Sequence, residues 1–238
     1  MDTSLFRREL TESDDFLVTV ELLTSPSDGV ESYVDFFQAY TERYEHRRGS
    51  PKLVAVTSPH SPGGMATLDP FTVWSESAGS LAQGLDAIAH VACKDLSRNG
   101  LDTHLRNLRS VGVGNILALT GDYPVDSKPV FDVDSLGLLQ LAMAANGRLI
   151  GQCDPEELDD VFRFTAGAGM NPYKYTLASA WQQYAKMLKK VTCGAEFIIT
   201  QVGYDVVMSA DLIRHARTHD VKAAIFGNVY LLTKTAAT

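Results

Sequence analysis

A glutamate ends an apolar run near the start of the 238-residue chain. Glu21 follows Val-Thr-Val and is followed by Leu22 and Leu23. Apolar neighbours withdraw water from a carboxyl, raise its pKa and suit it to act as a general acid near neutral pH. The same pattern fits a strand-end carboxylate that pairs with a nearby lysine. Glu21 is therefore a candidate acid, with that structural alternative open.

An aspartate stands at a second such position. Asp122 follows Gly121 directly after the apolar run NILALT. This pattern predicts a tight turn that presents a carboxylate at the end of a strand. The alternative is a turn-forming aspartate that hydrogen-bonds its own backbone.

Four further residues carry polar groups suited to binding. His90 lies inside the apolar run IAHVAC and is either a buried core residue or a hydrogen-bond donor to a cofactor. Gln201 follows FIIT and offers an amide donor and acceptor, which suits the edge of a pterin as well as other uses. Lys189 and Lys190 end a helical segment, where they either interact with the helix C-terminus or hold a pyrophosphate.

Several other chemistries lack their sequence patterns. The chain has no phosphate-binding P-loop, no GxSxG elbow and no HExxH helix. Its three cysteines, Cys93, Cys153 and Cys193, form no CxxC pair and have no histidine at zinc spacing. We therefore expect no metal site, no nucleotide-triphosphatase or hydrolase chemistry, and a reducing, cytoplasmic environment.

Short β-rich runs alternate with helical periodicity along the whole chain and must position these residues. The predicted helical segments include 101–111, 135–145 and 177–191. This βαβ series indicates a parallel sheet. The predicted strands are 17–22, 53–57, 87–93, 115–120, 161–168, 197–201 and 223–226.

A closed barrel and an open doubly wound sheet both fit this series. Polar residues fall at or just beyond the C-terminal ends of the predicted strands, which meet at one mouth in a barrel. They are Glu21, Thr57, His90 with Cys93, Asp122 and Gln201. No GxGxxG follows the first strand, which weakens the open-sheet interpretation. We therefore predict one domain, residues 1–238, with an α/β fold of the TIM-type (β/α) barrel class. Only seven strands are predicted, and the expected eighth is missing because only residues 227–238 follow Phe226.

The composition limits the classes of partner. With 45% hydrophobic and 21% charged residues, the chain is typical of a soluble globular protein. No apolar run reaches the roughly 18 residues of a membrane span, and the first ten residues predict no signal peptide. A net charge of −8 would repel nucleic acid. We expect neither a membrane nor a nucleic acid as partner.

An ordered set of motifs resembles the methylenetetrahydrofolate reductase family. The most specific are LALTGD, which contains Asp122, and KKVTCGAEFIITQ, which spans residues 189–201. Weaker matches, in chain order, are VTVELL, LVAVT, AHVACKDLSRNGL, KPVFDVDSLGLL and GAGMNPY. Together they run from about residue 17 to the end.

The resemblance implies an FAD-bearing β/α barrel that reduces 5,10-methylenetetrahydrofolate to 5-methyltetrahydrofolate, with NAD(P)H or a partner protein as electron donor. It makes Glu21 the acid that assists opening of the folate ring, and Asp122 a residue beside both folate and flavin. Gln201 would contact the pterin. It implies further cofactor contacts at Thr57, His90, Thr120, Gly121, Asp132, Val133, Asn171, Lys189 and Lys190. The flavin would carry the redox chemistry, so no protein metal is required.

The chain also departs from the family pattern. Thr120 stands where arginine is frequent, no proline follows Glu21, and the family's last strand and helix are not present. An open barrel edge would expose unpaired backbone, so we expect an oligomer or a partner protein to cover it. Two alternatives follow. One is a non-autonomous flavin- and folate-binding barrel that serves a partner in electron or methyl transfer. The other is a folate-dependent methyltransferase without flavin, which would not need the lysine pair.

Overall fold

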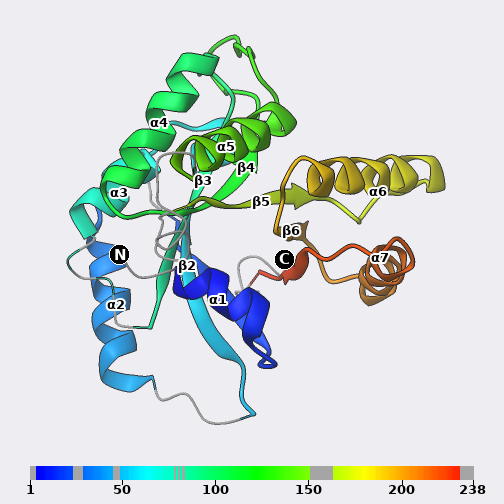
Figure 1. Cartoon of the computed structure of the whole chain (residues 1–238), viewed down its shortest axis with the longest axis horizontal. Helices are drawn as coiled ribbons and strands as arrows, with labels where there is room; N and C mark the ends of the chain where they lie inside the picture. Colours follow the sequence, from blue (N-terminus) through cyan, green and yellow to red (C-terminus); the bar gives the residue numbers. More distant parts are fainter. Residues whose placement is uncertain are drawn as a thin grey trace. The chain divides into compact units, whose positions relative to one another are not determined.

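The chain forms two compact units, which are described separately. The computed structural model describes residues 4–23, 29–44, 49–77, 79, 81, 84–150 and 163–230. The first unit is Met1–Ala166 and the second is Gly167–Thr238. Strands and helices alternate through both units (Figure 1).

The first unit contains four complete strands and begins a fifth. Its strands are β1 (Leu17–Glu21), β2 (Lys52–Ser58), β3 (Asp86–Ala92) and β4 (Asn115–Leu119), and β5 (Thr165–Met170) crosses the boundary between the units. Its helices are α1 (Leu5–Glu12), α2 (Glu31–Arg43), the short 3-10 turn η1 (Pro62–Gly64), α3 (Pro70–Ser77), α4 (Arg98–Ser110) and α5 (Ser135–Ile150).

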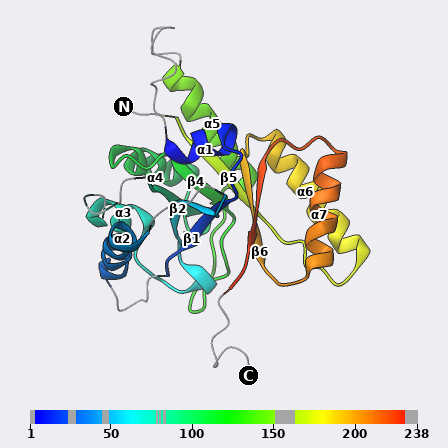
Figure 2. The same cartoon turned by 90° about the horizontal axis from the view of Figure 1, so that it is seen from below.

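The second unit continues the same alternation. It contains the rest of β5, then α6 (Leu177–Thr192), β6 (Phe197–Val202), α7 (Val206–Thr218) and β7 (Ala224–Asn228). Helices α6 and α7 lie on the same side of β6 (Figure 2).

The strands are parallel and follow one another in sequence order, from β1 to β7. In the first unit, Glu21 of β1 is level with Thr57 of β2, and His90 of β3 is level with Leu117 of β4. In the second unit, Phe197 of β6 lies between Gly167 of β5 and Ala224 of β7. This is the topology predicted for a TIM-type β/α barrel, and no eighth strand is found among the described residues.

Burial explains why these runs become strands. In β2, β3 and β4 nearly every residue is buried, as expected for parallel strands covered on both faces. The first unit's core is rich in aromatic side chains. Trp74 of α3 makes ring contacts with Tyr33 and Phe37 of α2, and all three are at most 1% exposed.

Side-chain caps define where several helices begin. Ser97, Thr176 and Asp205 accept backbone N–H groups in the first turns of α4, α6 and α7. Such caps satisfy N–H groups that have no partner within the helix.

The fifth strand begins later than predicted. We expected residues 161–168, but β5 runs from Thr165 to Met170, and residues 161 and 162 lie outside the described part. The reason is a side chain of α5. The Asn146 amide accepts the Phe164 N–H at 2.7 Å and donates to the Phe164 carbonyl at 2.9 Å. These two bonds occupy backbone groups that a strand neighbour would otherwise use.

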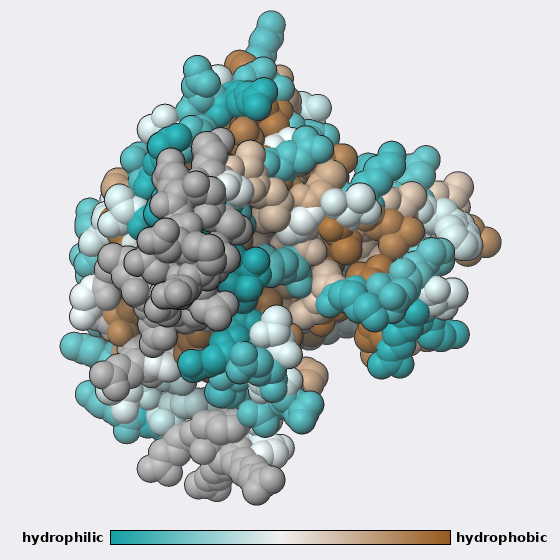
Figure 3. Space-filling model, in the orientation of Figure 1, coloured by the Kyte–Doolittle hydropathy of each residue, from teal (hydrophilic) through white to brown (hydrophobic). Residues whose placement is uncertain are grey.

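The remaining predicted boundaries agree with the structure to within three residues, except that α5 ends at Ile150 and not at residue 145. Helix α4 begins at Arg98, before the predicted residue 101, because Ser97 caps it there. In the described part of the chain, no helix is long and apolar enough to cross a bilayer. The face seen in Figure 3 mixes hydrophilic and hydrophobic residues, with hydrophobic surface visible on both units.

Candidate active site

Glu21 and Thr57 end neighbouring strands of the first unit. They are level in the β1–β2 pair, and the Leu22 N–H donates to the Thr57 carbonyl at 3.1 Å. The Thr57 side chain is buried, and its Oγ1 has no hydrogen-bond partner in the described structure. The unsatisfied Thr57 hydroxyl and the neighbouring Glu21 carboxyl are therefore two polar groups that a ligand could bind.

The surroundings of Glu21 favour its protonated form. Glu21 is reached by water at the strand end, but the protein around it removes part of its hydration and raises the pKa of the carboxyl. The Tyr33 hydroxyl is close by, where it donates to the Leu22 carbonyl at 2.5 Å. Burial, and secondly the charge of Glu21, raises the pKa of Tyr33, so this phenol stays protonated. The predicted acid therefore lies in a setting that favours holding a proton.

His90 is buried in β3 and is held neutral. Burial, together with neighbouring His60, lowers the pKa of His90 to about 4. Its Nε2 has no hydrogen-bond partner among the described residues. A neutral imidazole with a free nitrogen can donate or accept a hydrogen bond, but it does not supply a positive charge.

The loop after β4 is tightly constrained at Gly121. The Thr120 carbonyl accepts the Lys94 N–H at 3.0 Å, and Thr120 itself is exposed. Gly121 has a φ of +94°, and a Cβ there would lie 2.8 Å from Cβ of Lys94. Only glycine suits both the backbone conformation and the space.

Asp122 joins two loops of the first unit. Its Oδ2 accepts the Gly63 N–H at 3.0 Å, and the Val125 N–H donates to the Gly64 carbonyl at 3.3 Å. The carboxylate is exposed. Asp122 thus caps a backbone group of the loop after β2 and keeps an accessible oxygen. The alternative interpretation was an aspartate that bonds the backbone of its own turn. The backbone group that Asp122 binds instead belongs to Gly63, 59 residues away.

Asp132 and Val133 lie where α4 and α5 begin. Asp132 accepts the Arg98 N–H at 2.8 Å, so its charge faces the positive end of α4. Val133 contributes to a pocket of about 320 Å³, which is lined by Arg98, Val133, Gly137, Gln140, Leu141 and Ala144.

In the second unit, two predicted residues lie at strand ends. Asn171 follows β5, and its Oδ1 accepts the Tyr173 N–H at 2.9 Å, which shapes the following turn. Gln201 is exposed near the end of β6. Beside it, Thr200 is buried and accepts the Asn228 N–H through its hydroxyl at 2.9 Å.

The two lysines differ in what they contact. Both lie in the last turn of α6, where positive charge is favourable. The Lys190 ammonium donates to the Gly169 carbonyl of β5 at 2.6 Å, whereas Lys189 is exposed. Lys190 is therefore held by its own unit, and Lys189 is the more accessible cation.

The first unit brings Glu21 and Thr57 together and joins the loop of Asp122 to the loop after β2. Asn171, Lys190 and Gln201 keep contacts or positions within the second unit. The sequence analysis did not single out Tyr33, whose hydroxyl lies near Glu21, or the cluster His60, Asp69 and His104. No local motif marks these four residues, because each interacts with residues distant in the sequence.

A family model decides the classification. The model described as "Methylenetetrahydrofolate reductase" matches residues 8–237. The chain belongs to this family. The resemblance inferred from the motifs is thereby confirmed.

Named relatives in plants and yeast point the same way. Residue identity is 28% over 141 residues with methylenetetrahydrofolate reductase (NADH) 1 of Zea mays and 30% over 141 residues with the probable NADH enzyme of Oryza sativa subsp. japonica. With methylenetetrahydrofolate reductase 1 of Schizosaccharomyces pombe it is 29% over 147 residues. These alignments cover 56%, 56% and 61% of this chain but only 23% of each relative. The aligned part thus spans about a quarter of the relatives' length.

Solved structures share the fold. One is an uncharacterized protein from Clostridium thermocellum that binds two copies of 5-methyl-5,6,7,8-tetrahydrofolic acid, with a TM-score of 0.59 and 12% identity. The match covers 93% of this chain and 68% of that one. A 2,3-dimethylmalate lyase matches 100% of this chain and 75% of its own, with a TM-score of 0.62 and 14% identity. At these identities the likeness shows the fold alone.

Proposed function

We propose that this chain reduces 5,10-methylenetetrahydrofolate to 5-methyltetrahydrofolate with FAD as cofactor. One observation carries the proposal within the family: Glu21, a carboxyl whose pKa is raised by desolvation, lies level with a buried, unsatisfied Thr57 hydroxyl. Opening the folate's five-membered ring requires a proton donor at the reacting end of the site. Glu21 is the acidic group suited to that role.

The first unit's residues fit a flavin. Thr57 Oγ1 and His90 Nε2 are buried polar atoms that have no partner in the described structure, as expected where a cofactor supplies the hydrogen bonds. Flavin, when bound, supplies the hydride chemistry. In this proposal Thr57 and His90 orient the ring, Thr120 and Gly121 leave room for it, and Asp132 and Val133 contribute further contacts.

The remaining assignments concern charge and substrate. Asp122 keeps an accessible carboxylate oxygen that would stabilise cationic character on the substrate. Gln201 is exposed at the end of β6, where its amide would bind the pterin edge. Lys189 and Lys190 would hold the cofactor phosphates. Asn171, which follows β5, would make a further contact with the cofactor. Because Lys190 is already bonded to Gly169, we assign Lys189 the larger share of this contact.

The names of similar proteins support the choice of carrier and donor. The maize and rice relatives are NADH enzymes, and the Clostridium thermocellum protein binds a methylated tetrahydrofolate. We therefore propose NADH as the electron donor and tetrahydrofolate as the one-carbon carrier. The cysteine pattern, which suits a reducing environment, is the reason for proposing the cytoplasm as the compartment.

The test begins with the absorption spectrum of the purified chain. We expect flavin bands that bleach with NADH under anaerobic conditions and return when 5,10-methylenetetrahydrofolate is added. The Glu21→Gln variant should keep its flavin and its reduction by NADH but lose folate-dependent reoxidation by about 100-fold or more. Exposed Glu76 in α3 provides the matched control, since Glu76→Gln should leave both half-reactions unchanged.

The same experiment separates the alternatives. Bound flavin that NADH does not reduce would favour the barrel that serves a partner protein. Folate binding without any flavin would favour the methyltransferase. Undiminished reoxidation in Glu21→Gln would remove Glu21 from the mechanism.

A further inference from the structure

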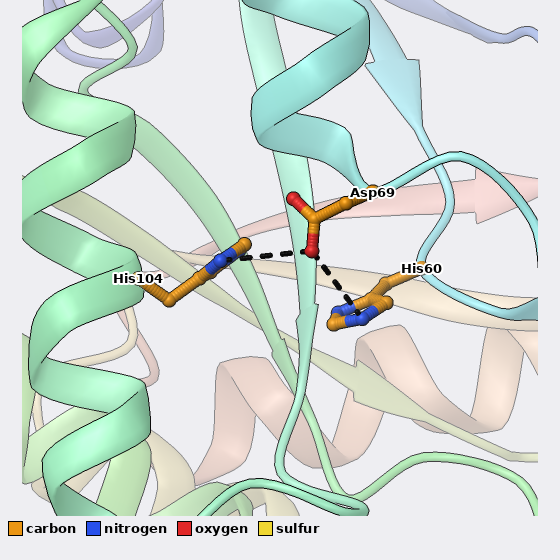
Figure 4. Close-up of side chains that lie close together, drawn as sticks. All are labelled: His60, Asp69 and His104. Carbon is orange, nitrogen blue, oxygen red and sulfur yellow. Dashed lines mark ion pairs between the residues drawn. The ribbon is translucent and has the colours of Figure 1, made fainter.

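Three side chains outside the proposed reductase assignments meet in the first unit. His60 lies in the loop after β2, Asp69 directly precedes α3, and His104 belongs to α4 (Figure 4). Asp69 Oδ2 is 3.8 Å from His60 Nε2 and 3.7 Å from His104 Nδ1. The two imidazole rings are stacked, with centroids 5.7 Å apart and an angle of 24° between their planes. The fold thus gathers two imidazoles around one carboxylate oxygen.

The cluster is shielded on the histidine side and open on the aspartate side. The side chains of His60 and His104 are 15% and 9% exposed, whereas that of Asp69 is 40% exposed. Burial lowers the pKa of both histidines, although Asp69 opposes that shift. Histidine binds metal ions through a neutral ring nitrogen.

Neighbouring groups hold the ligand atoms in place. The other carboxylate oxygen of Asp69 accepts the Phe71 N–H at 2.7 Å, so the carboxylate is fixed where α3 begins. The buried side chain of His104 has an Nε2 without a hydrogen-bond partner in the described part of the chain. The Phe71 contact to Asp69 is of the kind that orients ligands in metal sites.

We propose that His60, Asp69 and His104 bind a divalent transition-metal ion of the Zn²⁺ type. One ligand atom from each residue can be chosen so that all three lie within 4.8 Å of one another. Bonds of about 2.0–2.1 Å in tetrahedral geometry place ligand atoms about 3.3 Å apart. The two separations from Asp69 Oδ2, 3.8 and 3.7 Å, exceed this by a few tenths of an ångström, and the two imidazole ligand atoms lie within 4.8 Å of each other and must also approach. Two nitrogens and one oxygen favour Zn²⁺, Co²⁺ or Ni²⁺ over Mg²⁺ or Ca²⁺. Water completes the coordination on the exposed side of Asp69.

Two neighbours weaken the site. The Ala92 N–H is bonded to His60 Nδ1 at 3.2 Å, so in the metal-free protein the ring proton lies on Nε2. Binding through Nε2 moves that proton to Nδ1 and gives up the Ala92 bond. The buried ammonium of Lys94 also acts on His60, although Asp95 lies 3.5 Å from it. We therefore expect the ion to bind when it is added at micromolar concentrations, and the test uses added metal.

The bound ion would connect two points of the segment between β2 and β3 with the helix that follows β3. His60 belongs to the loop after β2, Asp69 holds the start of α3, and His104 lies on α4. A shared ion would stabilise this corner of the first unit without entering the redox chemistry. The inference is therefore independent of the proposed reductase function.

Titration of the purified full chain with Co²⁺ tests the proposal. Four- or five-coordinate Co²⁺ with nitrogen ligands absorbs visible light, and added Zn²⁺ should abolish that absorption by competition. Asp69→Asn and His104→Gln should each weaken Co²⁺ binding at least tenfold. Asparagine also caps helices, so Asp69→Asn removes the charge while it keeps the start of α3.

The control is a second histidine pair on the surface. His215 and His219 of the α7 region have ring centroids 4.0 Å apart and could bind metal adventitiously. The His219→Gln variant should bind Co²⁺ as the unmodified chain does. Far-ultraviolet circular dichroism checks that each variant is folded. The proposal is overturned if the unmodified chain shows no visible Co²⁺ spectrum, if both cluster variants keep it, or if His219→Gln loses it.

Discussion

At the scale of single residues, the candidate site consists of polar groups in settings that cost stability. Glu21 is partly desolvated, while Thr57 Oγ1 and His90 Nε2 are buried without partners in the described structure. Buried polar atoms usually find hydrogen bonds within the protein, and in the proposed function a bound ligand would satisfy these two. The free energy of unfolding should therefore respond to pH at Glu21 and to substitution in the candidate site.

The pKa of Glu21 predicts a pH-dependent stability difference. Desolvation raises the folded-state pKa of Glu21 above the ordinary value of 4.5, so the folded state binds the proton more tightly than the unfolded state. This contribution is fully present below about pH 4 and is lost as the pH rises through the folded-state pKa. Glu21→Gln should therefore gain stability relative to the unmodified chain as the pH rises from 4.5 to 8, measured by urea unfolding. A constant difference across that range would contradict the assigned desolvation.

Gly121 predicts a substitution cost with two parts. Alanine there would meet a φ of +94° and Cβ of Lys94 at 2.8 Å. The backbone conformation alone costs about 1 kcal/mol, and the contact should raise the total to about 2–3 kcal/mol. Gly112 has a φ of +83° and open space around its Cβ position, so Gly112→Ala isolates the backbone part. Equal losses of unfolding free energy in the two variants would show that the Lys94 contact relaxes without cost.

At the scale of elements, the apolar periodicity of the runs and the turn residues between them located the helices and strands well. Runs such as NILAL in β4 are buried on both faces and need no long-range information to be recognised. The start of β5 was predicted wrongly because Asn146, near the C-terminal end of α5, binds the backbone of Phe164. That interaction joins residues 18 apart and leaves no trace in the local apolar pattern.

The Asn146 amide predicts a specific loss of stability. Asn146→Ala removes two buried hydrogen bonds to the backbone of Phe164, which should cost about 2–4 kcal/mol. Hydrogen exchange should accelerate at the Phe164 amide in particular. Asn107 is exposed on α4, and Asn107→Ala should change the unfolding free energy by less than about 0.5 kcal/mol. Unchanged protection of the Phe164 amide would contradict the assigned role.

At the scale of the whole molecule, the buried core is unevenly divided between the units. The bulkiest fully buried side chains of the described residues lie in the first unit, with Phe197 as the exception. Both units expose some large apolar side chains, and those of the smaller second unit include Tyr175, Leu177 and Trp181. Because apolar burial is the main favourable term in folding, the second unit should be the less stable one.

The two tryptophans report on the two units separately. Trp74 is 1% exposed in the first unit, and Trp181 is 60% exposed in the second. In Trp74→Phe the remaining fluorescence follows the second unit, and its urea midpoint should be lower than that seen in Trp181→Phe. Far-ultraviolet circular dichroism of both variants corrects for any effect of the substitutions themselves. Coincident midpoints after that correction would show that the units unfold as one.

The sequence by itself determined the alternation of strands and helices, the parallel order and the family. Each depends on short-range periodicity or on contiguous motifs such as LALTGD, which survive without three-dimensional information. It also placed Glu21 and Asp122 at strand ends. Only the tertiary structure decided what these residues contact: Thr57 beside Glu21, Gly63 on Asp122, Gly169 on Lys190. The meeting of His60, Asp69 and His104 likewise required the fold, because packing brings together side chains whose spacing along the chain carries no signal.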